Sequence, residues 1–406
     1  ILAWWAPEGL TPDLLTGAPA GGFWAVAKRD LSEGIIALVG DPARMRAALQ
    51  ALVDASLLAR AGRADGPHAM HRMTGAALRA LQGEASAAQA ATALLAALYP
   101  YEVPDSANWP LCRRLTPHVR ALWGTGAAPR NTAMDYLLNQ TGVFLDAVGD
   151  YAGALALAEA RFELAKALHA PADREYAAAL HNLGTARIRV GDLDGALRAL
   201  RRVVELKETH RPGTEELAVS LDQLGFVLDE LARAGQRDHL PEAAKVTQRA
   251  LALLRGLHGR WAEPVALSLN NLGGIRRTQG RGAAAARLYA ASLRIRRAVL
   301  PEGDARLANV AMNSGASWLR AGRADLAEPL LREALEIWRA AYVAEPEHPE
   351  LRIAAGWLIS CLLVRAAAGE DAATREAEAR RLADEFGLDW AEVQAEARQY
   401  PYHPGG

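Results

Sequence analysis

Cysteine is scarce in this sequence: there are two in 406 residues, Cys112 and Cys361, and they lie far apart. A disulfide framework needs several closely spaced pairs, and a zinc knuckle needs four ligands in short-range pairs. Both are therefore excluded, and His118, close to Cys112 but without a second Cys/His pair, is expected to pack in the core. We expect a reduced protein in the cytoplasm with no metal site.

An excess of charge of one sign is also missing. Lys and Arg number 46 against 47 Asp and Glu, which gives a formal net charge of −1. The chain therefore has no overall basic field that would attract nucleic acid or an anionic membrane. The longest uncharged stretch, residues 85–101, is broken by Ser, Gln and Thr and closes on Pro100, so it is too polar and slightly too short to cross a bilayer. We expect neither nucleic acid nor membrane as a partner.

The first residues, 1–5, have no basic flank and too short an apolar run for a signal peptide. The chain begins without Met inside a segment that looks helical, so we expect a piece of a longer protein.

Isoleucine is also scarce: it occurs nine times, while Ala and Leu dominate. This composition favours helices over strands.

Sequence motifs for common enzyme chemistry are absent. There is no Gly-x-x-x-x-Gly-Lys-Ser/Thr loop for a triphosphate, no His-Glu-x-x-His and no Gly-x-Ser-x-Gly. Residues 124–126 (Gly-Thr-Gly) fail as a dinucleotide fingerprint because no strand precedes them. Residues 192–195 (Asp-Leu-Asp-Gly) lack the further acidic ligands of a calcium loop. The sequence predicts no catalytic residues and no enzyme in this part of the chain.

What the sequence does contain is a repeat. A glycine is followed seven residues later by a second glycine and five residues after that by an alanine. The first glycines of four copies are Gly142, Gly184, Gly273 and Gly315, and a fifth copy at Gly225 carries about six extra residues. The steps from 142 to 184 and from 273 to 315 are both 42 residues. Such a period indicates a repeat architecture.

The pattern predicts a helical hairpin. The first glycine and the alanine allow two antiparallel helices to approach closely, and the second glycine ends the first helix in a backbone conformation that side chains disfavour. One hairpin cannot bury its apolar face alone, so the hairpins are expected to stack into a solenoid.

Residues 180–184 (Leu-His-Asn-Leu-Gly) and 269–273 (Leu-Asn-Asn-Leu-Gly) resemble the tetratricopeptide repeats (TPRs) of the kinesin-light-chain-like variety. This resemblance implies an all-α fold, a right-handed α-solenoid of TPR hairpins. We assign five 42-residue units to residues 131–345. Residues 346–406 are interpreted as a degenerate sixth hairpin and a capping helix, with Trp357 in place of the marker glycine.

Residues 1–82 follow another layout. Thr11 and Asp41 each precede a proline as helix N-caps. A helix over 42–55 is followed by a short strand at 56–60, a turn at 61–67, a strand at 68–71 and a helix over about 74–81. This order predicts a small winged-helix domain, which a helical linker over 83–130 connects to the repeats.

Residues 69–73 (Ala-Met-His-Arg-Met) resemble the Met-His-Asp region of the winged helix in NB-ARC ATPases of the STAND class. Residues 108–119 resemble the segment that joins winged helix and repeats in bacterial members of that family. The resemblance implies that His71 senses nucleotide together with an ATPase domain missing from this chain, so ADP or ATP is expected in the full-length protein and no cofactor in this part. Arg72 departs from the family's Asp. The alternative for His71 is packing or capping of the following helix.

Amides recur at fixed positions before the marker glycines. Mid-helix amides work against helix propensity, so a set in register needs a reason. On the concave face of a solenoid they would form a ladder that pairs with the backbone of a bound peptide. The alternative is that they connect adjacent repeats. The candidate groove residues, including two arginines that would favour acidic partners, are Asn139, Gln140, Asn182, Arg189, Gln223, Asn270, Asn271, Asn313 and Arg320.

Three functions follow as hypotheses. The first is the sensor region of a bacterial STAND signalling protein, with a protein or peptide trigger in the TPR groove, a possible oligomer on activation and a possible role in antiphage defence. The second is a TPR interaction scaffold without a nucleotide switch. The third, a winged helix that binds DNA, is disfavoured because the helix over 74–82 offers only Arg79.

Overall fold

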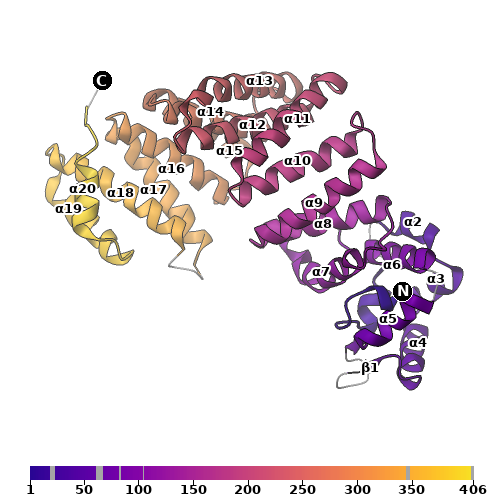
Figure 1. The fold of residues 1–406 in the computed structure, drawn as a ribbon. Coiled ribbons are helices and arrows are strands. Elements are labelled where there is room, and N and C mark those ends of the chain that lie inside the picture. Colours follow the sequence, from indigo (N-terminus) through magenta and orange to yellow (C-terminus); the bar gives the residue numbers. More distant parts are fainter. Residues whose placement is uncertain (19–22, 61–66, 82–83, 104, 344–347, 404–406) are drawn as a thin grey trace. The chain divides into compact units, whose positions relative to one another are not determined.

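The computed structural model describes residues 1–18, 23–60, 67–81, 84–103, 105–343 and 348–403 (Figure 1). Nearly all of these residues lie in helices or turns, and the strands that they contain are two of two residues each. The predicted all-α fold is confirmed. None of the described helices is long and apolar enough to span a bilayer.

The N-terminal region begins with short helices: η1 (Leu2–Trp4), α1 (Pro12–Thr16), α2 (Trp24–Ala27), η3 (Lys28–Asp30) and α3 (Glu33–Val39). The longer α4 (Pro42–Asp54) follows. Both predicted N-caps are present: the Thr11 hydroxyl accepts from the Leu14 N–H, and the Asp41 carboxylate accepts from the N–H groups of Ala43 and Arg44. These side chains satisfy helix-terminal donors that would otherwise lack partners.

A two-stranded antiparallel hairpin follows α4. Strand β1 (Ala59–Arg60) pairs with β2 (His68–Ala69). His68 of β2 also forms an isolated antiparallel bridge with Leu10. Residues 61–66 of the predicted turn lie outside the described residues. Helix α5 (Arg72–Leu81) completes the order helix, strand, strand, helix that the sequence predicts. The assignment to the winged-helix class itself stays a prediction.

The next two long helices, α6 (Glu84–Leu98) and α7 (Trp109–Gly124), with the short η4 (Ser106–Asn108) between them, share one core with the N-terminal residues. The Trp5 indole N–H donates to the Ala91 carbonyl at 3.2 Å, and the Ala6 N–H donates to Nδ1 of His118 at 3.2 Å. Buried residues of α6 and α7, within the predicted linker, therefore pack into the same core as Trp4 and Trp5.

The helical hairpins follow in the order that the repeat predicts. They are α8/α9 (Thr132–Ala147, Tyr151–Leu168), α10/α11 (Arg174–Arg189, Leu193–His210), α12/α13 (Glu215–Arg233, Leu240–His258), α14/α15 (Glu263–Thr278, Gly282–Val299) and α16/α17 (Ala305–Arg320, Ala324–Ala341). The extra residues of the third copy form η5 (Arg237–His239). Helices α18 (Pro349–Ala367), α19 (Ala372–Glu385) and α20 (Trp390–Ala397) end the chain.

The marker glycines have the role expected of them. A Cβ atom at Gly273 would lie 2.8 Å from the Tyr289 ring, and one at Gly315 would lie 2.7 Å from Cγ of Leu331. In these two hairpins the second helix therefore approaches to a distance that favours glycine, whereas a Cβ atom at Gly142 would lie 3.9 Å from Leu157, which is ordinary contact. The turn glycines have positive φ, 81° at Gly149 and 76° at Gly280, which L side chains rarely adopt.

The register predicted for the sixth hairpin is wrong. Its turn glycine is Gly369, with φ of 85°, and the residue seven positions earlier is the fully buried Leu362. Trp357 instead lies on a half-buried face of α18. The prediction assumed a step of 42 residues from the preceding repeat. The actual step between the turn glycines Gly322 and Gly369 is 47 residues.

The chain divides into two compact units, residues 1–199 and 200–406, so the boundary lies within α11. Each has its own core: one extends from Trp4 to Leu164, the other from Ala285 to Val393. The predicted boundary at 131 coincides with the N-cap Asn131 of α8, whereas those at 82/83 and 345/346 fall on residues outside the described ranges.

Candidate binding faces

In the first unit, the amides of adjacent repeats bond to each other. The Asn139 carbonyl oxygen accepts from Nδ2 of Asn182 at 2.9 Å and from Nη1 of Arg161 at 2.8 Å. Arg161 also forms a two-bond ion pair with Asp135, at 2.9 and 3.2 Å. The Arg161 side chain is 9% exposed, so this pair is largely shielded from water. These amides therefore connect α8, α9 and α10. This is the alternative that the sequence left open, in which the amides connect adjacent repeats.

The remaining candidates of this unit are engaged as well. Nε2 of Gln140, a buried residue, donates to the Tyr101 carbonyl at 2.6 Å and thereby holds the chain after α6. Arg189 is exposed; its guanidinium bonds to both oxygens of Asp146 in the preceding repeat and lies 5.7 Å from the Tyr151 ring. Gln140 would have to lose this hydrogen bond to bind a ligand, and the Arg189 guanidinium is already paired with Asp146.

A cavity of about 150 Å³ nevertheless lies between the same helices. Asn139, Asn182 and Arg161 form its polar part, while Gly142 and Val143 contribute to the rest of its lining. The network thus both fixes the helices and lines a cavity large enough for a side chain.

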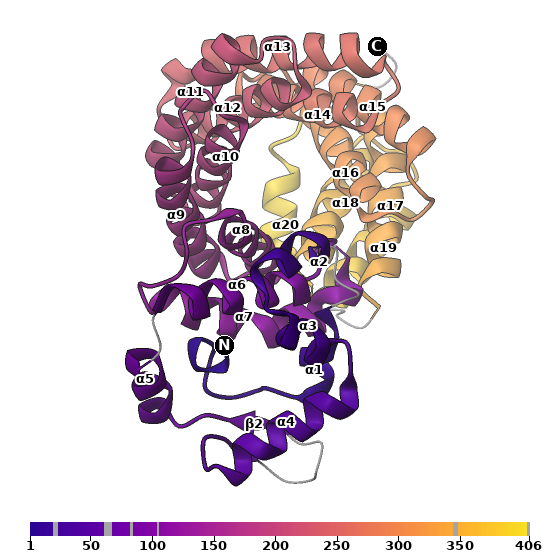
Figure 2. The ribbon, with the colours of Figure 1, turned by 90° about the vertical axis from the view of Figure 1, so that its right-hand side faces the viewer.

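In the second unit, one stripe follows the first helices of three repeats. Residues six and two before the marker glycine and one and five after it lie on one face of a helix, since these offsets differ by three or four. We call this set the inner stripe; its members are Val219, Gln223, Phe226 and Glu230 on α12, Leu267, Asn271, Gly274 and Thr278 on α14, and Asn309, Asn313, Ala316 and Arg320 on α16. In Figure 2, α16 and α18 lie along one side of this unit and α17 and α19 along the other.

Two amides of the inner stripe have unused hydrogen-bonding capacity. The carboxamides of Gln223 and Asn271 are partly exposed and bond to none of the residues that the structure describes. Next to them, Val219, Phe226 and Leu267 are 39%, 36% and 45% exposed. This part of the stripe therefore offers free donors and acceptors together with apolar surface.

The other predicted amides of this unit differ. Nδ2 of Asn313 donates to Oδ1 of Asn309 one turn earlier on α16, at 3.1 Å. Oδ1 of Asn270 is buried and has no hydrogen-bond partner among the described residues. A buried acceptor without a partner carries an uncompensated desolvation cost.

Two polar contacts hold α12 and α14 in register, one buried beneath the stripe and one exposed at its end. The Ser268 hydroxyl donates to the Asp222 carboxylate at 2.9 Å, and Nε of Arg233 donates to the Thr278 hydroxyl at 3.3 Å. Burial raises the pKa of Asp222 to about 7, an effect that the Ser268 hydrogen bond partly offsets. The spacing between Gln223 and Asn271 is thereby fixed by bonds on either side of them.

Arg320 ends the stripe. Its guanidinium lies 4.4 Å from the centre of the Trp357 ring, close enough for a cation–π interaction. It forms no ion pair with a carboxylate of the described residues. The arginine thus connects α16 to α18 through an aromatic ring.

His71 lies at the N-terminus of α5. Its Nδ1 accepts the backbone N–H of Met73 at 3.3 Å, so the side chain caps this helix. The residue is exposed and lines a cleft of about 560 Å³ together with Arg72 and Arg79. Because Nδ1 is the acceptor, the neutral ring carries its proton on Nε2, where it can donate to a ligand.

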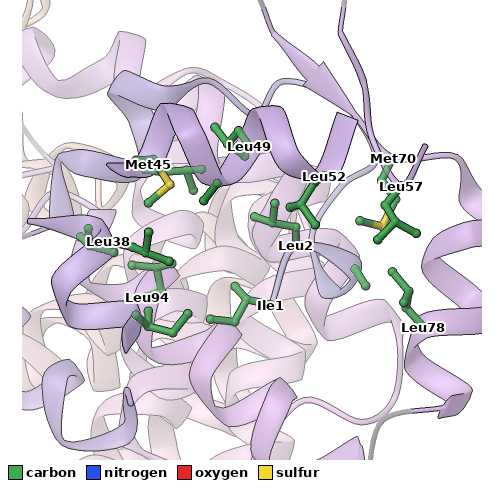
Figure 3. A pocket seen from close by; sticks show the side chains of 15 residues that line it. Ile1, Leu2, Leu38, Met45, Leu49, Leu52, Leu57, Met70, Leu78 and Leu94 are labelled. Carbon is green, nitrogen blue, oxygen red and sulfur yellow. The ribbon is translucent and has the colours of Figure 1, made fainter. Parts of the chain in front are cut away.

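A second cavity of the first unit, about 290 Å³, is lined almost entirely by aliphatic side chains and two methionines (Figure 3). Leu2, Leu49 and Leu94 point into it from three different segments. It holds no titratable side chain, so it offers shape and apolar surface but no acid–base chemistry.

Cys112 and His118 lie inside the core, as expected. Cys112 is fully buried and His118 is 1% exposed. Burial, and to a lesser degree the charge of Arg114, lowers the pKa of His118 to about 4. The imidazole is therefore neutral at physiological pH and accepts from the Ala6 N–H. Among the described residues, no group of three or more His, Cys, Asp or Glu side chains could hold a metal ion.

Sequence reasoning missed the partners of the amides. Arg161 and Asp135 lie on opposite helices of the first hairpin, and only their contact reveals the network. The exposed apolar residues Val219, Phe226 and Leu267 could have been found, because each lies at a stripe position of its helix.

Residues 264–340, which cover almost all of α14 to α17, match the tetratricopeptide repeat family. No curated protein matches the chain in sequence. The solved structures similar to it include BtubC (BKLC) from P. vanneervenii, 21% identical over 61% of this chain and 93% of that one, with a TM-score of 0.45.

A putative kinesin light chain with nearly identical TPR-like repeats from Podosopora anserina is 16% identical over 50% of this chain and 94% of that one, with a TM-score of 0.42. A Rap protein complexed with Competence and Sporulation Factor is 12% identical over 81% and 88%, with a TM-score of 0.49. The family match, together with the hairpins and their glycines, shows that this chain contains tetratricopeptide repeats.

Proposed function

We propose that this chain is a protein-interaction scaffold that binds an extended segment of a partner protein along the inner stripe of α12, α14 and α16. The free carboxamides of Gln223 and Asn271, one repeat apart on neighbouring helices, are the observation that carries this proposal. A carboxamide offers a donor and an acceptor, so it can pair with both the N–H and the C=O of an extended backbone.

The surroundings of these amides support the same function. Phe226 and Leu267 expose apolar surface that a partner's side chains can cover. Each buried Å² of such surface contributes roughly 25 cal/mol, while the amides determine the position of the bound backbone. Because Asp222–Ser268 and Arg233–Thr278 fix α12 against α14, the stripe is preorganised, which reduces the entropy lost on binding.

The first test is a double substitution, Gln223→Ala with Asn271→Ala. Neither side chain has an internal partner and Ala is the better helix former by up to about 0.7 kcal/mol per site, so the melting temperature should stay constant or rise slightly. Binding of a peptide selected on the wild-type chain from a random twelve-residue library should weaken by about 1–3 kcal/mol for each lost pair. Calorimetric melting and fluorescence anisotropy measure the two effects.

Asn139→Ala is the matched control. It removes the acceptor shared by Arg161 and Asn182, so the melting temperature should drop by several degrees, since a buried donor is left unpaired. If the double variant at Gln223 and Asn271 melts as low as Asn139→Ala, those amides are architectural. The proposal then loses its support.

We further propose that this scaffold is the sensor region of a bacterial STAND signalling protein, in which His71 contacts the nucleotide of an upstream ATPase domain. The cleft beside His71 supports this candidate: it places an Nε2–H donor next to Arg72 and Arg79, groups that suit phosphate oxygens. Partner binding on the repeats would then shift the balance between ADP-bound and ATP-bound states and promote an oligomer, in a role such as antiphage defence. The alternative is a scaffold without a nucleotide switch.

The test uses the full-length protein. His71→Ala should shorten ADP retention, because a hydrogen bond to a charged phosphate, worth about 1.5–3 kcal/mol, is lost from the closed state. His71→Gln, which keeps a side-chain donor, should retain more of it. Equal ADP occupancy in the wild type and both variants, or the absence of a P-loop upstream, would leave the scaffold function alone.

A further inference from the structure

The chain continues beyond α20 as an extended segment that returns to the preceding repeats. We call residues Tyr400–His403 the C-terminal segment. The His403 N–H donates to the Gly322 carbonyl at 2.7 Å, and the Tyr402 hydroxyl bonds to Glu370. The segment thus reaches the turn between α16 and α17 and the turn after α18.

The receiving surface is shaped for this segment. The Tyr400 ring lies 5.8 Å from Trp357, tilted by 44°, and Trp357 in turn carries the guanidinium of Arg320. At Gly322, φ is 78°, and a Cβ atom there would lie 2.7 Å from the His403 ring. The positive φ favours glycine at this turn, and any side chain there would have to displace the His403 ring.

The site lies at the end of the inner stripe. Arg320 is the last member of the stripe on α16, and its pKa is lowered by burial and by the charge of Arg277, while Tyr400 raises it. A cleft of about 590 Å³ lies beside the segment. Val364 and Ala367 of α18 line it, together with residues of α20 and the C-terminal segment. The C-terminal segment therefore contacts the surface where a segment bound along the stripe would end.

The segment is held weakly. Tyr400 and Tyr402 are only half-buried, and Pro401 and His403 are exposed. One backbone hydrogen bond links it to the α16–α17 turn, and segments with so few buried contacts open locally at small free-energy cost.

We propose that Trp357, Arg320 and Gly322 form a binding site for extended aromatic–proline–aromatic segments, which Tyr400–His403 occupies within the same chain. A partner segment of the same chemistry must displace the C-terminal segment, so the intact chain is partly blocked at this site. Trp357 supplies the aromatic contact to the ring of the occupying segment, and the Gly322 carbonyl supplies the backbone acceptor.

The test adds a fluorescein-labelled peptide of residues 398–403 to the full chain. Tyr400→Ala with Tyr402→Ala releases the internal segment and should strengthen peptide binding at least about ten-fold over the wild type, because a tethered competitor has an effective concentration in the millimolar range. Adding Trp357→Ala to this variant should abolish the gain. Trp261→Ala, which removes an exposed Trp from the loop before α14, is the matched control and should leave the gain intact.

The proposal is overturned if the peptide binds the wild type and the released variant equally, or if Trp357→Ala leaves the gain unchanged. Circular dichroism of each variant checks that the helices are retained. In addition, the His403 amide should exchange faster in the released variant, as a readout that requires no added peptide. The test involves neither Gln223 nor Asn271, so its failure is distinguishable from failure of the inner-stripe proposal.

Discussion

At the scale of single residues, Asp222 shows how burial couples this fold to pH. The residue is 5% exposed and its carboxylate has one hydrogen bond, from Ser268. Burial raises its pKa in the folded state to about 7, from an ordinary value of 3.8. Between these two values the folded state binds more protons than the unfolded state, so this group lowers stability as the pH rises from about 4 to 7.

We therefore predict that Asp222→Asn stabilises the protein above pH 7, by a few kcal/mol at most, and has little effect near pH 4. The amide keeps an acceptor for Ser268 but carries no charge to desolvate. Urea unfolding at pH 4, 6 and 8 measures the difference. Asp238→Asn, at an exposed position of the same unit, is the control; a parallel gain for both variants at pH 8 would contradict the buried-charge explanation.

At the scale of helices, the spacing within a hairpin depends on the marker glycine. The repeat pattern predicted this role from sequence, because a glycine in the middle of a helix costs stability unless packing requires it. Gly315 meets that condition, since Leu331 and the Ala327 carbonyl lie where its Cβ would be. Gly356, in the middle of α18, has open space at the corresponding position.

The two glycines should respond to alanine with opposite signs. Gly315→Ala should destabilise the protein by about 1–3 kcal/mol, because α17 must shift away from α16. Gly356→Ala should stabilise it by roughly 0.5–1 kcal/mol through helix propensity alone. Chemical denaturation of both variants tests this, and destabilisation at Gly356 would show that packing there is tighter than the described contacts indicate.

At the scale of the whole molecule, two cores predict two unfolding events. One core contains Leu115 of α7 and the other contains Leu358 of α18. Repeat proteins are stabilised mainly by contacts between neighbours, so cooperativity over long arrays is limited. Leu115→Ala should lower the free energy of unfolding by about 2–5 kcal/mol. We expect the backbone amides of residues 1–199 to exchange faster with solvent, while those of residues 200–406 keep their protection from exchange.

Leu358→Ala should do the reverse. Hydrogen exchange followed by mass spectrometry in low urea distinguishes the two halves. Simultaneous loss of protection across the chain in either variant would show that the units unfold as one.

The sequence by itself determined the helical hairpins, because their signals are local: a glycine period, N-caps such as Thr11 and Asp41, and an Ala- and Leu-rich composition. It also placed Cys112 and His118 in the core. Which amides are free was decided only by the tertiary structure. Asn139 and Gln223 are both polar residues in the middle of the first helix of a repeat. Asn139 bonds to Arg161 and Asn182 on two other helices, whereas Gln223 bonds to no residue that the structure describes. The register of the sixth hairpin and the return of Tyr400 to Trp357 likewise depend on loop length and on contacts between distant residues, which no local pattern encodes.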